Sequence, residues 1–525
     1  MTRKILLQLS PRSASDSVLI KDALHQELGT DPDKPLYFKV IKRSIDARGK
    51  SIRINLSVLV SETNSPEEPR FEPAYQNVSE SKSLCHIIGA GPAGLFAALR
   101  CLERGIRPIV FERGKDVQAR RRDLAAINRL QEVNPESNYC FGEGGAGTYS
   151  DGKLYTRSTK RGDVEKILRT LVYHGASSEI LVDAHPHIGT NKLPQLIQNI
   201  RQTILKHGGL IQFNSKLLDF TQQDGKIVSV SVSTSGVQND IPVQHLILAT
   251  GHSARDIYEL LHNKNILLEA KPFAMGVRAE HPQELIDSIQ YHCQDKASLI
   301  ELRHYLPAAS YSLVSQVENR GVYSFCMCPG GIIAPCATKQ DEVVTNGWSP
   351  SKRNNPFANS GIVVGLGLHD FTRYQHMGPL AGLELQKELE HRAWQLGGYK
   401  QSAPAQRLTD FVQGKNSSSL PDCSYQPGIV SANLLDVLGS KIGTVLKHGF
   451  KTFGQKMRGY LSSEAVIVGV ESRTSTPVRI PRDKDRLHHP QLHNLFPCGE
   501  GAGYAGGIMS AAMDGERCAN AIGFI

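Results

Sequence analysis

The chain has 525 residues, of which 40% are hydrophobic and 21% are charged, and its formal net charge is +9. This composition is ordinary for a globular protein, and the length is enough for two to four domains with cores of their own. The charge is modest for this length. It suits anionic cofactors or substrates, but it is too diffuse to indicate a nucleic-acid-binding protein by itself.

Ten irregularly spaced cysteines exclude a disulfide framework. Cys85, Cys101 and Cys498 lie within apolar patterns, as buried free thiols do, and no Cys/His set has the spacing of a zinc site. We therefore expect a reducing, cytoplasmic compartment and no metal. The apolar run at residues 5–7 is too short for a signal peptide, and no run approaches the ~18 apolar residues of a membrane span, so we expect no membrane contact.

Residues 1–62 are predicted to form a small α+β domain, followed by a polar, patternless linker at 63–82. The expected elements are strands at 4–9, 36–41 and 52–60 and a helix at 17–28. Five basic residues join the second and third strands, and they form either a solvated hairpin or a contact site for RNA, a partner or an acidic substrate: Lys42, Arg43, Arg48, Lys50 and Arg53.

A strand, a tight turn and a helix start follow one another at residues 85–96. The first glycine lets the backbone turn, the second lets a pyrophosphate approach, and the third lets the helix pack closely on the strand. The unpaired amides at the helix start would face the phosphates. The candidate cofactor-binding residues here are Gly89, Gly91, Pro92, Ala93 and Gly94.

A second apolar run, at 108–111, ends in Glu112. Its distance from Gly89 is close to the roughly 20 positions expected for the acid that binds a ribose hydroxyl, which favours FAD or NAD over NADP. Arg113 and Arg120 follow where they can meet adenosine or phosphate groups. For the neighbouring Arg121 and Arg122, a solvated helix face is an equal alternative.

Residues 142–152 include five glycines, so a helix or strand here would cost a large loss of backbone entropy. We interpret it as the cradle of a flavin isoalloxazine ring, with a flexible hinge as the alternative. Lys153 is a candidate for the N1/C2 edge of the ring or for an anionic substrate. The candidate residues of this loop are Gly144, Gly145, Ala146, Gly147, Thr148, Asp151 and Lys153.

A helix at 191–207 and short strands come next, and the last strand, at 243–249, returns the chain to the nucleotide-binding sheet. Its end at Ala249, Thr250 and Gly251 is the second mark of flavoproteins with two dinucleotide-binding domains. Leu217 is a further candidate contact. Residues 83–265 are therefore predicted to be the first part of an FAD-binding domain. The other strands are expected at 210–213, 216–221 and 227–232.

Residues 266–474 are predicted to be an inserted domain that forms the floor of a substrate cavity. Cys326 and Cys328 could be a redox pair or contact substrate, but the short loop between them favours buried structural thiols. Residues 362–367 resemble a second nucleotide-binding turn, yet Asp370 replaces the third glycine and no apolar helix follows. We expect strands at 273–279 and 321–327, helices at 380–394 and 437–453, and no dedicated nicotinamide-binding domain.

The last segment, 475–525, is predicted to complete the FAD-binding domain. A short strand ends at Gly499, and Glu500 can accept a hydrogen bond from a ribityl hydroxyl. A helix of small residues begins near Gly507, with its N-terminus directed at the flavin edge that becomes negative on reduction. The candidate residues are Gly499, Glu500, Gly506, Gly507 and Ile508.

These segments resemble the uncharacterised bacterial FAD-dependent dehydrogenase (oxidoreductase) family. The resemblance implies bound FAD and an oxidoreductase without a settled substrate. More distantly, the chain is similar to flavoproteins with one FAD domain and an inserted substrate domain, from which it departs at Glu500, where aspartate is usual. The matching segments are 89–94 with Glu112, 142–153, 248–256, 325–331, 470–480 and 499–515.

The fold is thus predicted to be α/β: a Rossmann-like FAD-binding domain with an inserted α+β substrate domain and a small N-terminal α+β domain. We expect an FAD-dependent oxidoreductase whose small-molecule substrate lies between 144–148, the inserted domain and 506–508. NAD(P)H would have to reach the open flavin face, or a protein would deliver electrons. The alternatives are an RNA-modifying FAD protein, although nucleic acid is the less favoured partner, and a non-catalytic flavin sensor. The sequence identifies no catalytic acid or base.

Overall fold

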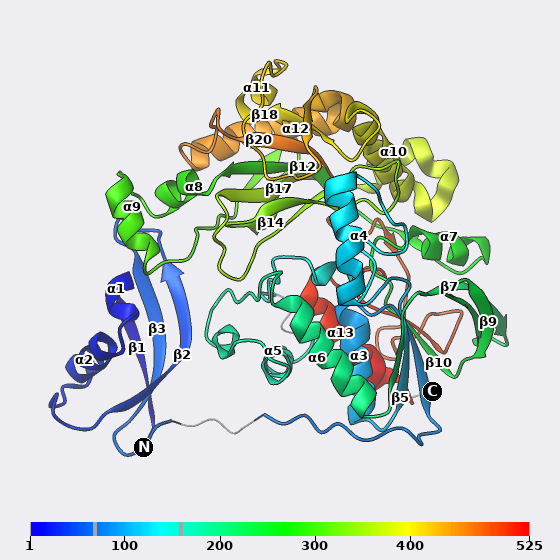
Figure 1. Cartoon of the computed structure of the whole chain (residues 1–525), viewed down its shortest axis with the longest axis horizontal. Helices are drawn as coiled ribbons and strands as arrows, with labels where there is room; N and C mark the ends of the chain where they lie inside the picture. The colour runs from blue at the N-terminus through cyan, green and yellow to red at the C-terminus, as the bar shows by residue number, and fades with distance from the viewer. Residues whose placement is uncertain (1, 67–70, 157–160, 294, 524–525) are drawn as a thin grey trace.

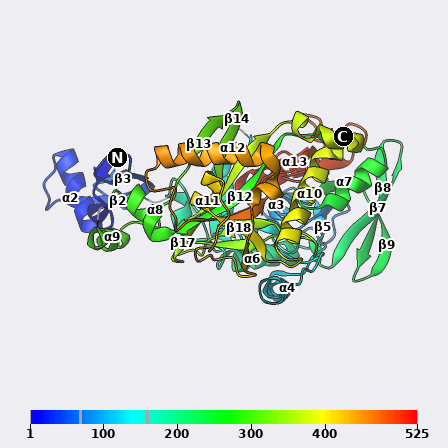
Figure 2. The ribbon, with the colours of Figure 1, turned by 90° about the horizontal axis from the view of Figure 1, so that it is seen from above.

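The computed structural model describes residues 2–66, 71–156, 161–293 and 295–523. Figure 1 shows the small N-terminal domain at the left, a domain with a large sheet at the top, and a domain with a parallel sheet at the lower right. Seen from above, the N-terminal domain lies at one end of the molecule, next to α8 and α9, and the β7–β9 hairpins lie at the other (Figure 2). The predicted fold class is confirmed.

The parallel sheet has the strand order β22-β10-β4-β5-β6. The sequences of its strands are continuous apolar runs because both faces of the sheet are covered. Ile87, Ile247 and Phe496 face the helical side, whereas Ile88 and Leu248 face the opposite side. The strands are β4 (Leu84–Ile88), β5 (Arg107–Phe111), β6 (Leu210–Gln212), β10 (His245–Leu248) and β22 (Leu495–Pro497).

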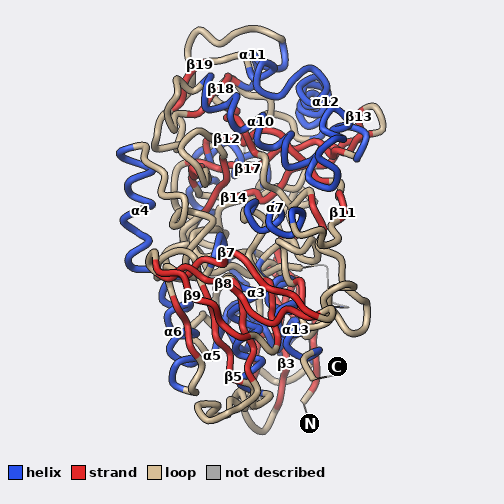
Figure 3. Tube along the Cα trace, turned by 90° about the vertical axis from the view of Figure 1, so that its right-hand side faces the viewer, coloured by secondary structure: helices blue, strands red, loops and turns tan. Residues whose placement is uncertain are grey.

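Helices cover one face of this sheet and a second, antiparallel sheet covers the other, as the side view in Figure 3 shows. The helices are α3 (Pro92–Glu103), α5 (Val164–Tyr173), α6 (Leu193–Lys206) and α13 (Ile508–Ala521), and the covering sheet is β7 (Ser215–Gln223), β8 (Lys226–Thr234) and β9 (Val237–Pro242). The sequence did not predict β9, because most of its residues are exposed and it lacks an apolar pattern. Two further helices, α4 (Val117–Leu130) and α7 (Arg255–Asn263), reach toward the upper domain.

The upper domain is built on a seven-stranded sheet of order β13-β14-β17-β12-β20-β18-β19, antiparallel except between β18 and β19. Residues 362–366 lie inside β17, paired with β12 and β14, so this glycine pattern is an antiparallel strand and not a nucleotide-binding turn. The strands are β12 (Phe273–Pro282), β13 (Val314–Val317), β14 (Arg320–Cys328), β17 (Phe357–Leu366), β18 (Ala403–Arg407), β19 (Ile429–Ser431) and β20 (Val466–Glu471).

Shorter elements complete this domain and its junction with the parallel sheet. They are the strands β11 (Glu269–Ala270), β15 (Ile332–Pro335), β16 (Thr345–Trp348) and β21 (Val478–Arg479) and the helices α8 (Gln283–Gln290), α9 (Lys296–Arg303), α10 (Ala381–Leu396), α11 (Leu408–Gln413) and α12 (Leu434–Lys456). The predicted helices at 380–394 and 437–453 correspond to α10 and α12.

The N-terminal domain is a three-stranded sheet of order β1-β3-β2 with two helices. Lys42 and Arg43, expected in a connection between strands, lie inside β2. The backbone of Arg43 bonds to Val182 and Ala184, and its side chain pairs with Asp183 at 2.8 Å. Part of this region is therefore an interface within the chain. The elements are β1 (Arg3–Leu9), α1 (Pro11–Ala14), α2 (Ser17–Leu28), β2 (Tyr37–Asp46) and β3 (Arg53–Ser61).

Candidate functional site

Three glycine-bearing segments meet at one edge of the parallel sheet. β4, β10 and β22 are neighbours, and their carboxyl ends point the same way. The Ala249 amide bonds to the Ile88 carbonyl at 2.9 Å, and the Cys498 amide bonds to the Leu248 carbonyl at 3.0 Å. The turns that follow these strands therefore lie side by side, at the edge where ligands bind in open α/β sheets.

A cavity of about 400 Å³ opens at this edge. It extends between the parallel sheet, the glycine-rich loop after α4 and the inserted domain. Most of the predicted site residues line it: Gly89, Gly91, Pro92, Ala93, Glu112, Arg113, Gly145, Ala146, Gly147, Asp151, Lys153, Leu217, Ala249, Thr250, Gly251, Glu500, Gly506, Gly507 and Ile508.

Five predicted residues do not line the cavity. Arg120 is fully buried and donates to the carbonyls of Asn138 and Glu143. Its guanidinium group therefore stabilises the glycine-rich loop by hydrogen bonds on the side away from the cavity. Thr148 donates its hydroxyl to the same Glu143 carbonyl. The other three are packing glycines: Gly94, Gly144 and Gly499.

The glycines around the cavity fall into two kinds. A Cβ on Gly94 would lie 1.9 Å from the Gly89 carbonyl oxygen, so this glycine is needed for packing of the helix on the strand. A Cβ on Gly251, Gly506 or Gly507 would meet no protein atom within 4 Å, and one on Gly91 would meet only the Gly145 Cα, at 3.9 Å. The second kind leaves backbone open to the cavity, as a flat or phosphate-bearing ligand requires.

Glu112 is held in place by backbone amides. Its carboxylate accepts hydrogen bonds from Ala90, Gly114 and Gly142, each at 2.9 Å, and the residue is 4% exposed. A carboxylate has about four acceptor positions. Three are filled here, which leaves one for a ligand hydroxyl and fixes its direction.

A charged cluster borders the cavity near Glu112. Arg113 lies over the Phe141 ring at 4.2 Å and pairs with Glu136 at 2.6 Å and Asp256 at 3.0 Å. Burial alone would raise the pKa of Asp256, but Arg113 and Lys216 outweigh it and lower that pKa. Phe141, Lys216 and Asp256 line the cavity although the sequence did not single them out as site residues. They come from different elements, so no local spacing connects them.

Near the N-terminus of α13, His252 lies 3.6 Å from Glu500, which precedes that helix in the chain. Burial lowers the pKa of His252 to about 4, with Arg473 and Arg255 contributing, and burial raises the pKa of Glu500 to about 7. At neutral pH the imidazole is therefore neutral, and the carboxyl holds a proton more tightly than a solvent-exposed glutamate does. This pair can hold or release a proton beside the cavity.

The inserted domain supplies the facing wall through Phe325, Cys326 and Asn346. Arg473 and Thr474, at its end, also line the cavity. The Lys153 ammonium group donates to the Met327 carbonyl of this wall and lies 4.0 Å from the Asp151 carboxylate. The glycine-rich loop and the inserted domain are thus joined directly at the cavity.

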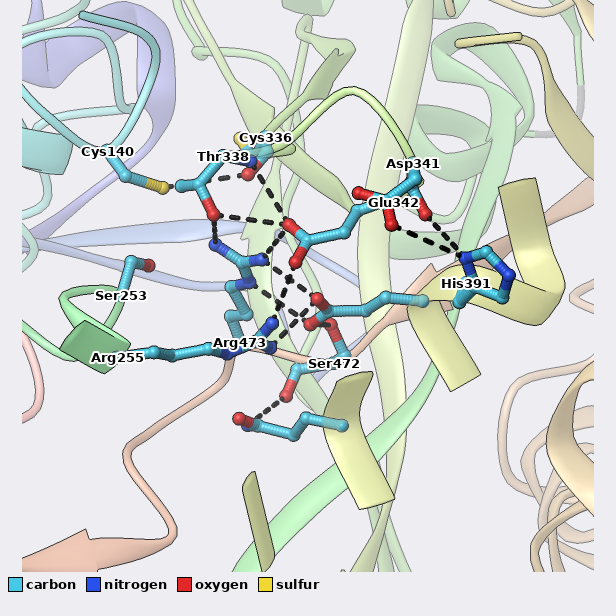
Figure 4. A network of polar contacts seen from close by, with 12 residues as sticks. Cys140, Ser253, Arg255, Cys336, Thr338, Asp341, Glu342, His391, Ser472 and Arg473 are labelled. Atoms are coloured by element: carbon cyan, nitrogen blue, oxygen red, sulfur yellow. Dashed lines mark hydrogen bonds and ion pairs between the residues drawn. The ribbon is translucent and has the colours of Figure 1, made fainter. Parts of the chain in front are cut away.

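A buried ion-pair network connects α7, which carries Arg255, to the inserted domain (Figure 4). Arg255 pairs with Glu342 at 2.9 Å and with Glu390 at 2.8 Å, and Arg473 pairs with both carboxylates at 2.8 Å. Burial would raise the pKa of Glu390, but the two guanidinium groups lower it to about 2. In Figure 4 both arginines point toward the carboxylates, and Thr338 lies at one end of the network, where it accepts from Arg473 at 2.9 Å. This network fixes Arg473 at the cavity wall.

One group among the described residues has metal-like spacing: Cys498, Asp514 and Cys518, all buried. The Arg482 guanidinium donates to Asp514 at 2.6 and 2.9 Å and to the Cys518 sulfur at 3.3 Å. Arg482 therefore supplies the positive charge that balances the Asp514 carboxylate in this group.

Comparison with known proteins defines the class. The model of the "FAD-dependent protein, C-terminal domain-like" family matches residues 272–474, and a domain of unknown function matches residues 1–61. An uncharacterized protein of Clostridium beijerinckii is 40% identical over 505 residues, which cover 92% of this chain and 91% of that protein. The chain belongs to this family of FAD-dependent proteins. FAD is its cofactor, as the sequence predicted.

The similar solved structures share much less sequence with this chain than the Clostridium protein does. A geranylgeranyl bacteriochlorophyll reductase-like protein of Thermoplasma acidophilum has 12% identity and a TM-score of 0.34, covering 83% of this chain and 77% of its own. The flavin-dependent brominase Bmp2 has 13% identity and a TM-score of 0.34, with the same coverage. Among the helices in the described part of the chain, none combines the length and apolar character needed to cross a membrane.

Proposed function

We propose that this protein oxidises or reduces a small molecule at an FAD held in the cavity described above. One observation carries the proposal: residues 89–93, 145–147 and 500–508 contribute to the lining of a single cavity. If these segments bordered different cavities, the reading of all three as parts of one cofactor site would fail. FAD, when bound, supplies the two-electron redox chemistry.

The two helix N-termini give the site its anion-binding character. α3 begins at Pro92 and α13 at Ile508, and both starts lie in the cavity lining. Neither helix has a side-chain cap, so its first amides are open to a ligand. We assign α3 to the pyrophosphate and α13 to the edge of the flavin that gains negative charge on reduction.

The remaining side chains have distinct roles in this proposal. Glu112 directs its one open acceptor position to the adenosine ribose. Lys153 places a positive charge between the loop and the inserted domain. The pair of His252 and Glu500 holds a proton that can move to or from substrate as electrons transfer.

Electron supply is part of the same proposal. Residues 362–366 of the second glycine pattern form part of β17, and we therefore propose that NAD(P)H binds at the open flavin face or that a protein delivers the electrons. The substrate would be a small molecule bound between the loop at 145–147, Ile508 and the wall formed by Phe325.

The test is to purify the protein, record its absorbance spectrum, and add NADH or NADPH without oxygen. The expected result is a flavin spectrum that bleaches with at least one donor and returns when oxygen is admitted. Protein that binds no flavin would refute the site. Protein with bound flavin that no donor reduces would instead support a non-catalytic flavin sensor. Absence of bulk RNA binding at low salt would remove the RNA-modifying alternative.

A further inference from the structure

Cys326 stands at a bulge in β14. β14 pairs with β17 through Phe325 with Gly361 and through Cys328 with Asn359, so β14 carries one extra residue in this interval. The φ angle of Cys326 is +48°, in the left-handed region that side chains rarely adopt. Bulges beside active sites commonly redirect a side chain. Here Cys326 lines the cavity, whereas Cys328, two residues on, is fully buried.

Two cations hold this bulge. The Arg278 guanidinium is fully buried and donates to the Cys326 carbonyl at 2.7 Å and to the Cys328 sulfur at 3.4 Å. The Lys153 ammonium donates to the intervening Met327 carbonyl. Cys328 in turn donates its thiol to the Cys326 carbonyl at 3.2 Å. The backbone between the two cysteines is therefore fixed, and both sulfurs lie near positive charge.

This environment makes the two thiols different. Interaction with the neighbouring Cys328 side chain lowers the pKa of Cys326 most, with Lys153 and Arg278 adding to the effect against burial. The same interaction and burial raise the pKa of Cys328. The carboxyls that face Cys326 oppose ionisation only weakly, because burial raises the pKa of both Glu471 and Glu500 to about 7. Asp151 also faces this thiol, and it is paired with Arg353 at 2.8 Å.

We propose that Cys326 and Cys328 are a redox pair that exchanges two electrons with the flavin, Cys326 being the cavity-facing thiolate and Cys328 its buried partner. This inference rests on the proposed function, since it needs FAD in the cavity. In the oxidising direction, the Cys326 thiolate and the Cys328 thiol form one S–S bond. The Cys328 proton and two electrons pass to the oxidised flavin, which becomes the anionic reduced flavin, so atoms and charge balance.

Electron counting tests the pair. FAD-bound protein is oxidised with diamide, freed of reagent, and titrated anaerobically with dithionite. We expect wild type to take up four electrons per flavin, two for the flavin and two for the disulfide. Cys326→Ser and Cys328→Ser should each take up two. Cys293→Ser is the matched control, because this thiol lies outside the cavity lining, and it should take up four. Wild type that binds flavin but takes up only two electrons would overturn the proposal.

A second measurement does not depend on flavin. After diamide treatment, the peptide with Cys326 and Cys328 should be two hydrogens lighter and should resist iodoacetamide, in flavin-free protein as well. Before oxidation, Cys326 should alkylate at lower pH than Cys293, and Lys153→Met should move its profile to higher pH. Two thiols that remain free after diamide would refute the pair even if the protein reduces substrate through FAD. If the disulfide forms but the wild-type protein cannot be loaded with added FAD, the cofactor site is refuted instead.

Discussion

The two walls of the cavity are built in different ways. The wall from the parallel sheet consists of short, continuous segments in which a strand ends, glycines turn the chain and a helix begins, as at 88–93 and 497–508. The wall from the inserted domain consists of single residues, Cys326, Asn346 and Arg473, from distant parts of the chain. In the proposed function, the first wall binds the cofactor and the second wall contacts the substrate.

The largest expected effect is on the first wall. Gly91→Val should abolish FAD retention, because the side chain would enter the space next to the α3 amides, while the flavin-free protein should keep its melting temperature. The measurement is the ratio of flavin to protein absorbance after purification. Gly49→Val, in the N-terminal domain where a Cβ meets only Ser51 at 3.9 Å, is the control. A fully loaded yellow Gly91→Val protein would show that this turn does not hold the pyrophosphate.

Gly94→Ala separates packing from binding on the same turn. Its Cβ would lie 1.9 Å from the Gly89 carbonyl, so the helix must move off the strand. We expect the flavin-free protein itself to melt at lower temperature, which Gly91→Val should not show. Equal melting temperatures for the two variants would contradict the division into two kinds of glycine.

The junction between the walls should be the next most sensitive place. Arg255→Met leaves Glu342 and Glu390 with one arginine, and removal of one partner from a buried ion network typically costs about 3–5 kcal/mol of unfolding free energy. Urea unfolding of the flavin-free protein measures this. Arg122→Met, on the exposed face of α4, is the control. A loss no larger than that of the control would mean that the network does not stabilise the junction.

Glu112→Ala tests the ribose assignment on the first wall. FAD affinity should fall by about 1–3 kcal/mol, the range for loss of a buried charged hydrogen-bond partner. Three amides also lose their acceptor, so the flavin-free protein should be less stable too. FAD titration and thermal melting separate the two effects, with the exposed Glu132→Ala as control. Unchanged FAD affinity would place the ribose elsewhere.

The most gradual expected effect concerns the proton pair on the first wall, His252 and Glu500. Burial raises the pKa of Glu500 from 4.5 to about 7, so the folded protein holds this proton more tightly than the unfolded chain. Relative to Glu500→Gln, wild type should therefore lose stability as pH rises from about 4.5 to about 7, at no more than about 1.4 kcal/mol per pH unit. Parallel stability curves for the two proteins would show that this carboxyl has no raised pKa.

The sequence alone determined the nucleotide-binding part of the fold and its cofactor. The glycine spacing at 89–94, Glu112 after the next strand, and the strand ends at 249–251 and 499–500 depend on backbone geometry within a few residues, and such patterns are visible in a linear chain. The same local logic identified α10, α12 and the apolar strands. It failed for β9, because an exposed strand carries no apolar pattern.

Only the tertiary structure decided which charged and thiol groups face the cavity. Arg120 looked like a phosphate contact, but it turns inward to carbonyls; the bulge at Cys326 turns one thiol toward the cavity and leaves the other buried. The arginines at 255 and 473 meet the carboxylates at 342 and 390 across 83 or more positions of sequence only because the sheets stack as they do. Long-range packing sets side-chain direction, and no local pattern records it.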